Sequence, residues 1–383
     1  MTRSEEIMKE IRRQYMEKEN SDIADLAKKG IRIIQFLPTL AYGDAIGNNV
    51  VAIDALLEKE GYETKIYAQN IDQRLEKGLC EHLDKFSSTK DDIILYHLSI
   101  GGETNRIFKK CEGKKWVIYH NVTPAHFFEK YDKRLYELCK TGLDNVKELA
   151  TAPDLCIADS SFNKDDLVSY GYKCPIEVLP IIIRFEDYEK TPNKAVINKY
   201  SDDYVNIIFT GRISPNKKHE DIINAFYYYK KFINPKSRLL LIGAHNEDDN
   251  YYQKLKLYVE ESNIEDVVFT GHIAFDEILA YYKVADVFLC MSEHEGFCVP
   301  LVEAMYFEVP IIAYAEAAVP ETLGGSSILL DTKDPKVVAE AIDMVVKDED
   351  LRKTIIANQN ERLKDFNNDV IKERFLEILE KYL

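Results

Sequence analysis

The feature that most constrains this fold is an alternation of apolar and amphipathic segments that occurs twice along the chain. In the first half, short apolar runs typical of buried strands lie at residues 31–37, 62–68, 93–97, 116–120, 155–158 and 176–179. In the second half, similar runs lie at residues 205–209, 238–242, 267–269, 287–290, 310–314 and 327–330. Helical patterns, the first at 49–60, follow these runs, and such alternation predicts parallel βαβ units. The chain is therefore predicted to be α/β, with two Rossmann-like doubly wound parallel-sheet domains.

A single interruption of the alternation suggests the domain boundary. The stretch Pro180 to Pro192 is polar and rigid, and we interpret residues 184–198 as an interdomain linker. The predicted domains are then residues 1–183 and 199–362, and a helix at 363–383 is predicted to return to the first domain. Apolar residues at helical spacing also predict an amphipathic helix at 4–28. That helix either packs on the first domain or meets a partner or a membrane surface.

Composition excludes several classes of partner. The net charge of −16 argues against nucleic acid and against broad docking on anionic lipid, so we expect at most peripheral membrane contact. The seven cysteines form no C-x-x-C pair, which favours free thiols over disulfides or a zinc site. No apolar leader or membrane-spanning run is present in the sequence. We therefore expect a cytoplasmic protein.

The segment from Ala285 to Met305 combines a buried strand, a loop and a helix that Pro300 opens. Glu295 lies in the loop, and Glu303 is predicted in the first turn of the helix. Gly296 allows close backbone approach to a ligand, and free N–H groups at a helix start bind anions. Carboxylates bind sugar hydroxyls, so the segment suits a sugar nucleotide. Two glutamates eight residues apart are, by themselves, unremarkable in a chain with 66 acidic residues, and their spacing alone favours an ordinary surface.

Cations and glycines follow other predicted strands. Arg212 and Lys217 come after Gly211 at a strand end, where a guanidinium and an ammonium suit a diphosphate. Lys218 is an alternative to Lys217. Near the first strand, the predicted loop at 38–48 contains Gly43 and Asp44; Asp44 either orients a hydroxyl or caps the next helix.

Histidines complete the set of candidates. His120 directly follows a predicted strand, a position that suits either a structural or a catalytic residue. His97 is a weaker candidate. The remaining histidines lack partners at metal-ligand spacing, and we predict that they lie on the surface: His82, His126, His219, His245 and His294.

The string Ser292–Met305 closely resembles the E-x7-E signature of retaining glycosyltransferases of family 4, also called glycosyl transferases group 1. Gly211, Arg212 and Lys217 resemble the G-R-x4-K string of the same family. The resemblance implies a GT-B fold, in which two Rossmann-like domains face a central cleft. It implies catalytic roles for His120, Arg212, Lys217 and Glu295. It implies donor binding by Gly43, Asp44, Gly211, His272, Ile273, Gly296, Phe297, Cys298, Val299 and Glu303.

The resemblance also implies the reaction. A hexosyl unit would move, with retention, from a nucleotide-sugar donor (a UDP-, GDP- or dTDP-hexose) to a hydroxyl of a saccharide or lipid-linked glycan acceptor. The motifs around Gly43 and His120 look like those of enzymes of bacterial surface polysaccharide biosynthesis. No metal and no other cofactor is expected, because Arg212 and Lys217 supply positive charge and the one D-x-D, Asp348–Asp350, has no strand before it. The alternatives are a sugar-nucleotide epimerase or phosphorylase on the same fold, and a non-catalytic subunit that binds a sugar nucleotide.

Overall fold

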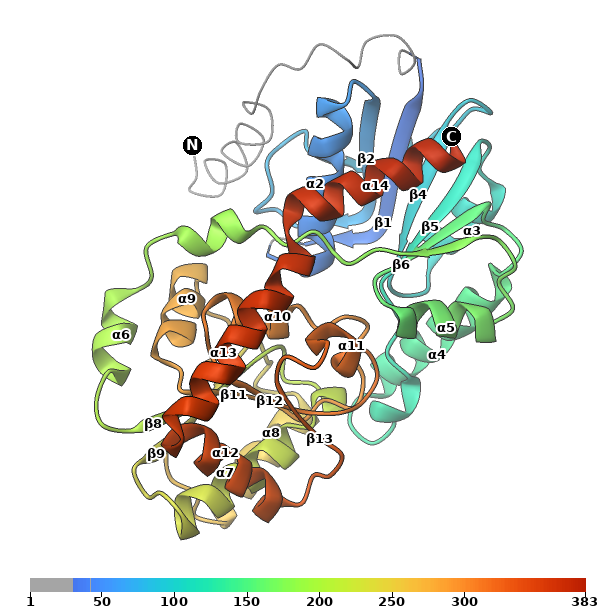
Figure 1. Ribbon diagram of the computed structural model, residues 1–383. Coiled ribbons are helices and arrows are strands. Elements are labelled where there is room, and N and C mark those ends of the chain that lie inside the picture. The colour runs from blue at the N-terminus through green and yellow to red at the C-terminus, as the bar shows by residue number, and fades with distance from the viewer. Residues whose placement is uncertain (1–29, 42) are drawn as a thin grey trace. The chain divides into compact units, whose positions relative to one another are not determined.

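A computed structural model describes residues 30–41 and 43–383 of the chain (Figure 1). The helix predicted at 4–28 lies outside the described residues. Contacts divide the chain into two compact units. The first unit comprises the residues up to Pro124 together with Glu137–Arg184 and Asn368–Leu383, and the second comprises Ala125–Tyr136 and Phe185–Asn367.

The described residues of the first unit form a seven-stranded parallel sheet in the order β3-β2-β1-β4-β5-β6-β7. Its strands are β1 (Arg32–Leu40), β2 (Glu63–Ile71), β3 (Glu81–His82), β4 (Ile93–Leu98), β5 (Lys114–Tyr119), β6 (Leu155–Ala158) and β7 (Ile176–Val178). Its helices are α2 (Ala45–Lys59), η1 (Leu83–Lys85), α3 (Glu103–Lys110), α4 (Lys133–Glu148, of which residues 133–136 are counted with the second unit), α5 (Ser161–Ser169) and α14 (Asn368–Tyr382). The strand order reverses between β1 and β4, as in a doubly wound fold.

The first strand differs from its predicted end. We expected a loop from Pro38, yet β1 continues to Leu40. Its ladder with β4 ends at the pair of Phe36 and Tyr96, whereas its ladder with β2 extends to Leu40 and Ile71. Proline is tolerated where no ladder needs its N–H. The short strand β3 was missed, because two residues carry no periodic signal.

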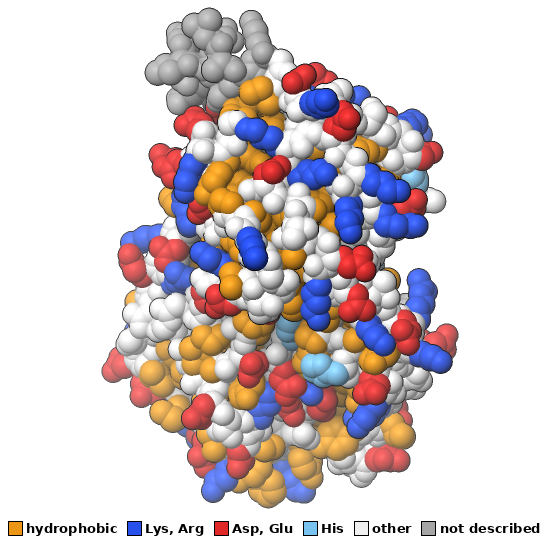
Figure 2. Space-filling view, turned by 90° about the vertical axis from the view of Figure 1, so that its right-hand side faces the viewer, with side chains coloured by type: hydrophobic (Ala, Val, Ile, Leu, Met, Phe, Trp, Pro, Cys, Tyr) orange, Lys and Arg blue, Asp and Glu red, His pale blue; other side chains and the backbone are white. Residues whose placement is uncertain are grey.

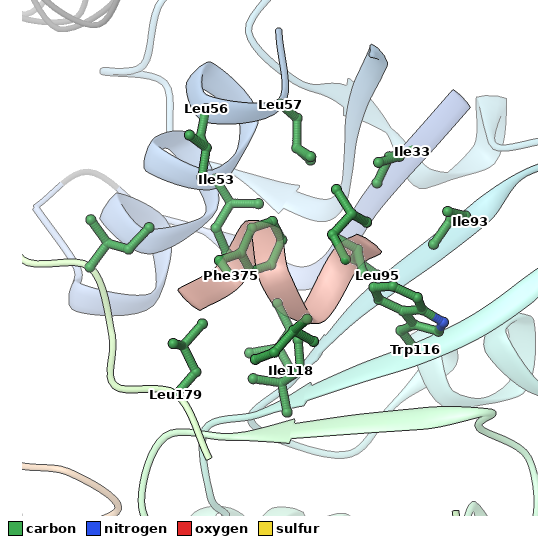
Figure 3. Close-up of a cluster of buried hydrophobic side chains, with 14 of the residues drawn as sticks. Ile33, Ile53, Leu56, Leu57, Ile93, Leu95, Trp116, Ile118, Leu179 and Phe375 are labelled. Carbon is green, nitrogen blue, oxygen red and sulfur yellow. The ribbon is translucent and has the colours of Figure 1, made fainter. Parts of the chain in front are cut away.

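The C-terminal helix α14 packs on the core of the first unit (Figure 3). Phe375 lies beside Ile53 and Ile118, and Trp116 closes the same cluster. At the surface, Arg374 donates to the carbonyl of Val178 (2.8 Å). Phe375 therefore shares one core with residues that precede it by 257 (Ile118) and 322 (Ile53) positions, and burial of apolar surface by α14 stabilises the first unit.

The second unit contains a six-stranded parallel sheet in the order β10-β9-β8-β11-β12-β13. Its strands are β8 (Val205–Thr210), β9 (Ser237–Ile242), β10 (Val267–Phe269), β11 (Val287–Cys290), β12 (Ile311–Tyr314) and β13 (Ile328–Leu330). Its helices are η2 (Ala125–Phe127), η3 (Phe185–Glu189), α6 (Lys194–Tyr200), η4 (Pro215–Lys217), α7 (His219–Phe232), α8 (Asn250–Glu261), α9 (Phe275–Val284), α10 (Val299–Tyr306), α11 (Val319–Leu323), α12 (Pro335–Lys347), α13 (Glu349–Leu363) and η5 (Lys364–Phe366). The order reverses between β8 and β11. The predicted α/β class with two Rossmann-like parallel sheets is confirmed.

Two segments outside this alternation also belong to the second unit. The segment 125–136 docks through Tyr131, whose carbonyl accepts from Asn250 (2.7 Å) and whose ring lies 5.1 Å from that of Tyr251. Residues 185–198, interpreted above as a linker, contact the same unit. The N–H of Asn193 donates to the carbonyl of Asp276 (2.9 Å). Sequence alternation did not reveal either docking, because both depend on contacts with residues far along the chain.

The surface carries acidic and basic side chains side by side on the face shown in Figure 2. Within the described residues, no helix is both long and apolar enough to cross a membrane.

Candidate active site

The candidate site of the second unit lies at the carboxyl end of its sheet. Ligands of open α/β sheets bind there, where the strand order reverses. Gly211 and Arg212 directly follow β8, and the loop 291–298 follows β11. Because β8 and β11 are hydrogen-bonded neighbours, the two predicted motifs meet at one place.

Lys217 and Glu295 form the central contact of this site. The Lys217 Nζ lies 2.5 Å from Glu295 Oε1 and 2.6 Å from Oε2. The side chains are 19% and 8% exposed, so solvent screens the pair weakly. Burial lowers the pKa of Lys217, but the Glu295 carboxylate outweighs this effect and the pKa is raised overall. Lys217 is therefore fully charged and points at the first glutamate of the signature.

The other two cations lie differently. Arg212 is exposed, and no described residue accepts a hydrogen bond from its guanidinium. Lys218 has a left-handed backbone (φ 53°) and pairs with Glu293 (2.9 Å), which also binds Lys333 (2.7 Å). Lys217, and not Lys218, thus pairs with Glu295. The exposed Arg212 guanidinium is available to bind an anion.

Hydrogen bonds hold the loop that carries Glu295 in place. Asn216 accepts from the N–H of Glu293 (2.9 Å) through its carbonyl and donates its side-chain amide to the carbonyl of His294 (3.0 Å). The carbonyl of Glu295 accepts from Ala318 N (3.3 Å). The loop is therefore fixed on both sides before a ligand binds, which reduces the entropy cost of binding.

Glu303 is the fifth residue of α10, one residue later than predicted and just past the first turn, because the helix starts at Val299 rather than Pro300. Its carboxylate accepts hydrogen bonds from the hydroxyls of Tyr188 (3.0 Å) and Tyr282 (2.7 Å). Burial raises the pKa of Glu303, and the two hydroxyls oppose that shift. Each carboxylate oxygen keeps a lone pair for another donor. The two tyrosines, which sequence reasoning missed, fix the orientation of this carboxylate.

Replacing Tyr188 with phenylalanine is expected to destabilise the protein by about 1–3 kcal/mol, because a buried carboxylate loses a hydrogen bond. Urea denaturation would measure the change. Tyr306→Phe is a matched control, since its ring stands 5.2 Å from that of Tyr188 but no described residue hydrogen-bonds its hydroxyl. Equal destabilisation by the two substitutions would contradict the bonded role of Tyr188.

The remaining predicted donor residues lie along the same edge of the sheet. Gly211 abuts Gly243, where a Cβ would stand 2.0 Å from the Gly211 carbonyl oxygen, so β8 and β9 approach closely. His272 and Ile273 follow β10, two strands away from β8. The N-terminal end of α10 is formed by the predicted residues Gly296, Phe297, Cys298 and Val299. The Phe297 side chain is buried and meets Phe366 edge-on at 5.5 Å.

In the first unit, Asp44 caps a helix. Its carboxylate accepts from the N–H of Gly47 (3.2 Å) at the start of α2. Gly43, immediately before it, is exposed and adopts φ 73°, a conformation that favours glycine. Of the two roles considered for Asp44, the structure shows the capping role.

His120 is part of a buried chain of hydrogen bonds in the first unit. Its Nδ1 lies 2.8 Å from Asp159 Oδ2, and its Nε2 lies 2.9 Å from His97 Nδ1. His97 Nε2 in turn lies 3.0 Å from Gln35 Oε1. The imidazole of His120 is 1% exposed, and Asp159 is 3% exposed. Sequence reasoning missed Gln35 and Asp159, although Asp159 directly follows a strand, as His120 does.

The protons of this hydrogen-bond chain can be assigned by starting from Gln35. The Gln35 amide donates to the carbonyl of Val50 (3.1 Å), so its oxygen faces His97 and His97 carries a proton on Nε2. Burial and the neighbouring His120 hold the pKa of His97 well below its usual range. Neutral His97 therefore accepts at Nδ1 from His120 Nε2, which leaves one proton between His120 Nδ1 and Asp159. Both ring nitrogens of His120 are engaged within the first unit.

Three histidines predicted on the surface are not there: His219 and His294 are 0% and 9% exposed, and the side chain of His245 is 7% exposed. The surface prediction was wrong for His219 because this residue starts α7 and packs edge-on against the ring of Phe209, with the ring centroids 5.2 Å apart. Burial, and secondarily Lys217, lower the pKa of His219 from 6.5 to about 3.

The low pKa of His219 predicts an acid-sensitive fold. A neutral buried histidine stabilises the folded state fully above pH 6.5, and the contribution is lost as the pH falls toward the folded pKa. In the wild type, the free energy of unfolding is expected to fall by up to roughly 1.4 kcal/mol per pH unit as the pH drops below 6.5. His219→Phe is expected to abolish this contribution to the slope. Denaturant titrations at several pH values would measure this slope, with exposed His126→Phe as the control. Parallel slopes for wild type and His219→Phe would contradict the assignment.

Comparison with known proteins finds a family that matches most of the second unit. The family described as "Glycosyl transferases group 1" matches residues 189–362. The chain is 27% identical over 209 residues to the capsular polysaccharide biosynthesis glycosyltransferase CapM of Staphylococcus aureus. It is 28% identical over 178 residues to an undecaprenol-linked-glycan α-1,4-N-acetyl-D-galactosaminyltransferase of Campylobacter jejuni. These matches cover 52% and 45% of this chain, and 53% and 47% of the relatives' lengths, so the chain spans about half of each relative.

Solved structures show the same fold. Anabaena HepE, determined in complex with UDP-glucose, superposes with a TM-score of 0.70 at 18% identity, covering 91% of this chain and 99% of HepE. This likeness and the two parallel sheets confirm the predicted GT-B fold class.

Proposed function

Because residues 189–362 match the glycosyl transferases group 1 family, we propose that this protein is a hexosyltransferase that uses a nucleotide-sugar donor. The observation that carries the proposal is the Lys217–Glu295 pair at the carboxyl end of β8 and β11. Both partners belong to motifs that the sequence resemblance assigns to donor binding. The named activities of the similar capsule and glycan enzymes support surface polysaccharide or lipid-linked glycan synthesis as the context.

In the proposed donor complex, Arg212 and Lys217 bind the diphosphate. The leaving diphosphate gains negative charge in the transition state, and fixed cations stabilise that charge more than they stabilise the ground state. The N–H groups at the start of α10 add partial positive charge. Lys217 also holds the carboxylate of Glu295, which would accept hydrogen bonds from hydroxyls of the donor sugar.

Glu303 is proposed to bind the ribose hydroxyls through the lone pairs that Tyr188 and Tyr282 leave open. A carboxylate that is already oriented pays less entropy when it accepts a vicinal diol. Base recognition is proposed for the backbone of His272 and Ile273. The positions of these residues along one sheet edge support the proposal.

Retention is proposed to occur on one face of the donor sugar, with the leaving phosphate oxygen taking the acceptor proton. In this scheme Glu295 positions the sugar and does not attack it, since its carboxylate is already paired with Lys217. The two side-chain cations supply the charge that a metal would otherwise supply.

A panel of UDP-, GDP- and dTDP-hexoses tests the proposal in two stages. One donor is expected to raise the melting temperature, because a ligand that binds only the folded state stabilises it. That donor is then incubated with saccharide and lipid-linked acceptors, and proton NMR reads the anomeric configuration of the product. Turnover that persists in EDTA supports side-chain cations, whereas EDTA inhibition that Mn²⁺ restores would overturn that part. A new sugar nucleotide formed without acceptor would identify an epimerase instead.

A further inference from the structure

Two thiols and a carboxylate meet at the start of α10, and the proposed reaction uses neither thiol. The Sγ atoms of Cys290 and Cys298 and a carboxylate oxygen of Glu295 all lie within 4.8 Å of one another. Cys290 ends β11, and Cys298 is the N-cap of α10 with a left-handed backbone (φ 75°). All three residues are buried. Among the described residues, this is the one group of three such side chains close enough to share an ion.

We propose that Cys290, Glu295 and Cys298, here called the thiol–carboxylate site, bind a thiophilic divalent cation such as Zn²⁺ or Cd²⁺, and that the bound cation inhibits the protein. Two thiolates with one oxygen ligand are a set that zinc accepts, with water in the fourth position. The inhibitory part rests on the proposed function, whereas the binding part does not.

The geometry is close to that of a bound ion. Zinc binds sulfur at about 2.3 Å and carboxylate oxygen at about 2.0–2.2 Å, so tetrahedral ligand atoms lie roughly 3.5–3.8 Å apart. Ligand atoms that already lie within 4.8 Å of one another need to move by only about 1 Å. The backbone bonds at Glu293, His294 and Glu295 hold the loop, so rotation of side chains suffices for this movement.

The charges also balance. Burying ions is costly unless opposite charges neutralise them. Two thiols lose their protons to the solvent when the cation binds, and two thiolates neutralise a divalent cation. Lys217 and Glu295 remain a neutral pair, because the carboxylate can keep one oxygen on the Lys217 ammonium and place the other on the ion. Binding therefore releases two protons and tightens as the pH rises.

Inhibition follows from the position of Glu295. An ion on its carboxylate would remove the acceptor proposed for the donor sugar hydroxyls. Coordination of Cys298 would also fix the residue whose N–H belongs to the anion-binding start of α10. A chelator should then leave activity unchanged or raise it, which separates this cation from a catalytic metal.

A second thiol pair serves as the internal comparison. In the first unit, the Sγ atoms of Cys156 and Cys174 lie 3.5 Å apart. No third ligand joins them in a metal-sized group within the described part of the chain. A cation bound there would have two protein ligands rather than three, so we expect weaker binding.

The test titrates the reduced, chelator-stripped full-length protein with Cd²⁺, which gives an ultraviolet thiolate charge-transfer band. The parent protein is Cys156→Ser/Cys174→Ser, so that the rival pair is removed. We expect the parent to bind one Cd²⁺ per chain. When Cys290→Ser is introduced into the parent, Cd²⁺ should bind at least about 100-fold more weakly, because loss of an outer-shell partner alone costs about 10–100-fold in metal affinity. Cys298→Gly provides a second variant that keeps the N–H and favours the left-handed backbone.

Activity supplies the second arm. Zn²⁺ is expected to inhibit turnover by the parent, and EDTA is expected to restore it. Cys290→Ser is expected to keep the basal turnover and to be insensitive to Zn²⁺. Cadmium binding that both variants retain would overturn the proposal, as would an intact mass showing that Cys290 and Cys298 are oxidised to a disulfide instead. If Cd²⁺ binds as expected but no donor turns over, the proposed function fails and the site stands.

Discussion

Lys217→Ala is expected to lower kcat by about 100- to 1,000-fold, the loss typical of removing one group that stabilises transition-state charge. The expected reason is twofold: the leaving diphosphate loses a cation, and Glu295 loses the partner that holds both its oxygens at 2.5 and 2.6 Å. Steady-state turnover with the donor identified by thermal shift would measure the effect. Arg212→Ala is expected to cost on the order of 100-fold by the same principle.

Lys218→Ala is the matched control for Lys217→Ala. Lys218 is the adjacent cation, but it pairs with Glu293, so its loss should leave kcat within a few-fold of wild type. Circular dichroism and melting temperature must accompany the assay, because an unpaired buried Glu295 also destabilises the fold. Equal loss of turnover in the two lysine variants would contradict the assignment of Lys217 to the diphosphate.

Asp159→Ala is expected to destabilise the protein by about 3–5 kcal/mol, the usual effect of removing one partner of a buried ion pair. Burial raises the pKa of Asp159, and the bond from His120 opposes that shift. Without Asp159, the proton that His120 Nδ1 shares has no acceptor, while Nε2 remains committed to His97. Urea denaturation at pH 7 would measure the loss.

Asp165→Ala provides the comparison, because Asp165 is an exposed aspartate of the same unit and its removal should change stability by no more than about 0.5 kcal/mol. Asp159→Asn separates charge from hydrogen bonding. Its amide can donate to a neutral His120 Nδ1, so it should retain more stability than the alanine variant. If Asp159→Ala lowered the free energy of unfolding by less than about 1 kcal/mol, the result would contradict the buried hydrogen bond between His120 and Asp159.

Much of the sheet architecture was predictable from the chain. The strands β6, β10 and β11 begin and end where the apolar runs do. For β6 and β11 the reason is that a strand buried on both faces reads as a continuous apolar segment. The end of β1 was not predictable, because a proline such as Pro38 ends a strand only where a neighbouring strand needs a hydrogen bond from that position. The ladder with β4 ends before Pro38, at Phe36, and the sequence does not show where that ladder ends.

The candidate site was predictable in part. Glu295, Glu303, Arg212 and Lys217 stand out by spacing, and the resemblance to a family whose model matches residues 189–362 is confirmed. Tyr188 and Tyr282 were not found, because they precede Glu303 by 115 and 21 residues and belong to no shared motif. The hydrogen-bond chain that runs from Gln35 through His97 and His120 to Asp159 was also missed, because its bonded side chains are up to 62 residues apart in sequence.

Local spacing thus determined the fold class, the glycine-rich strand ends and the motif that defines the family, because hydrophobic period and backbone freedom act over a few residues. Tertiary structure alone decided which lysine meets Glu295, which hydroxyls hold Glu303, how both nitrogens of His120 are occupied and where residues 125–136 pack. Those outcomes depend on burial and hydrogen-bond partners that come together only after the chain folds, when each buried polar group must find a partner within reach.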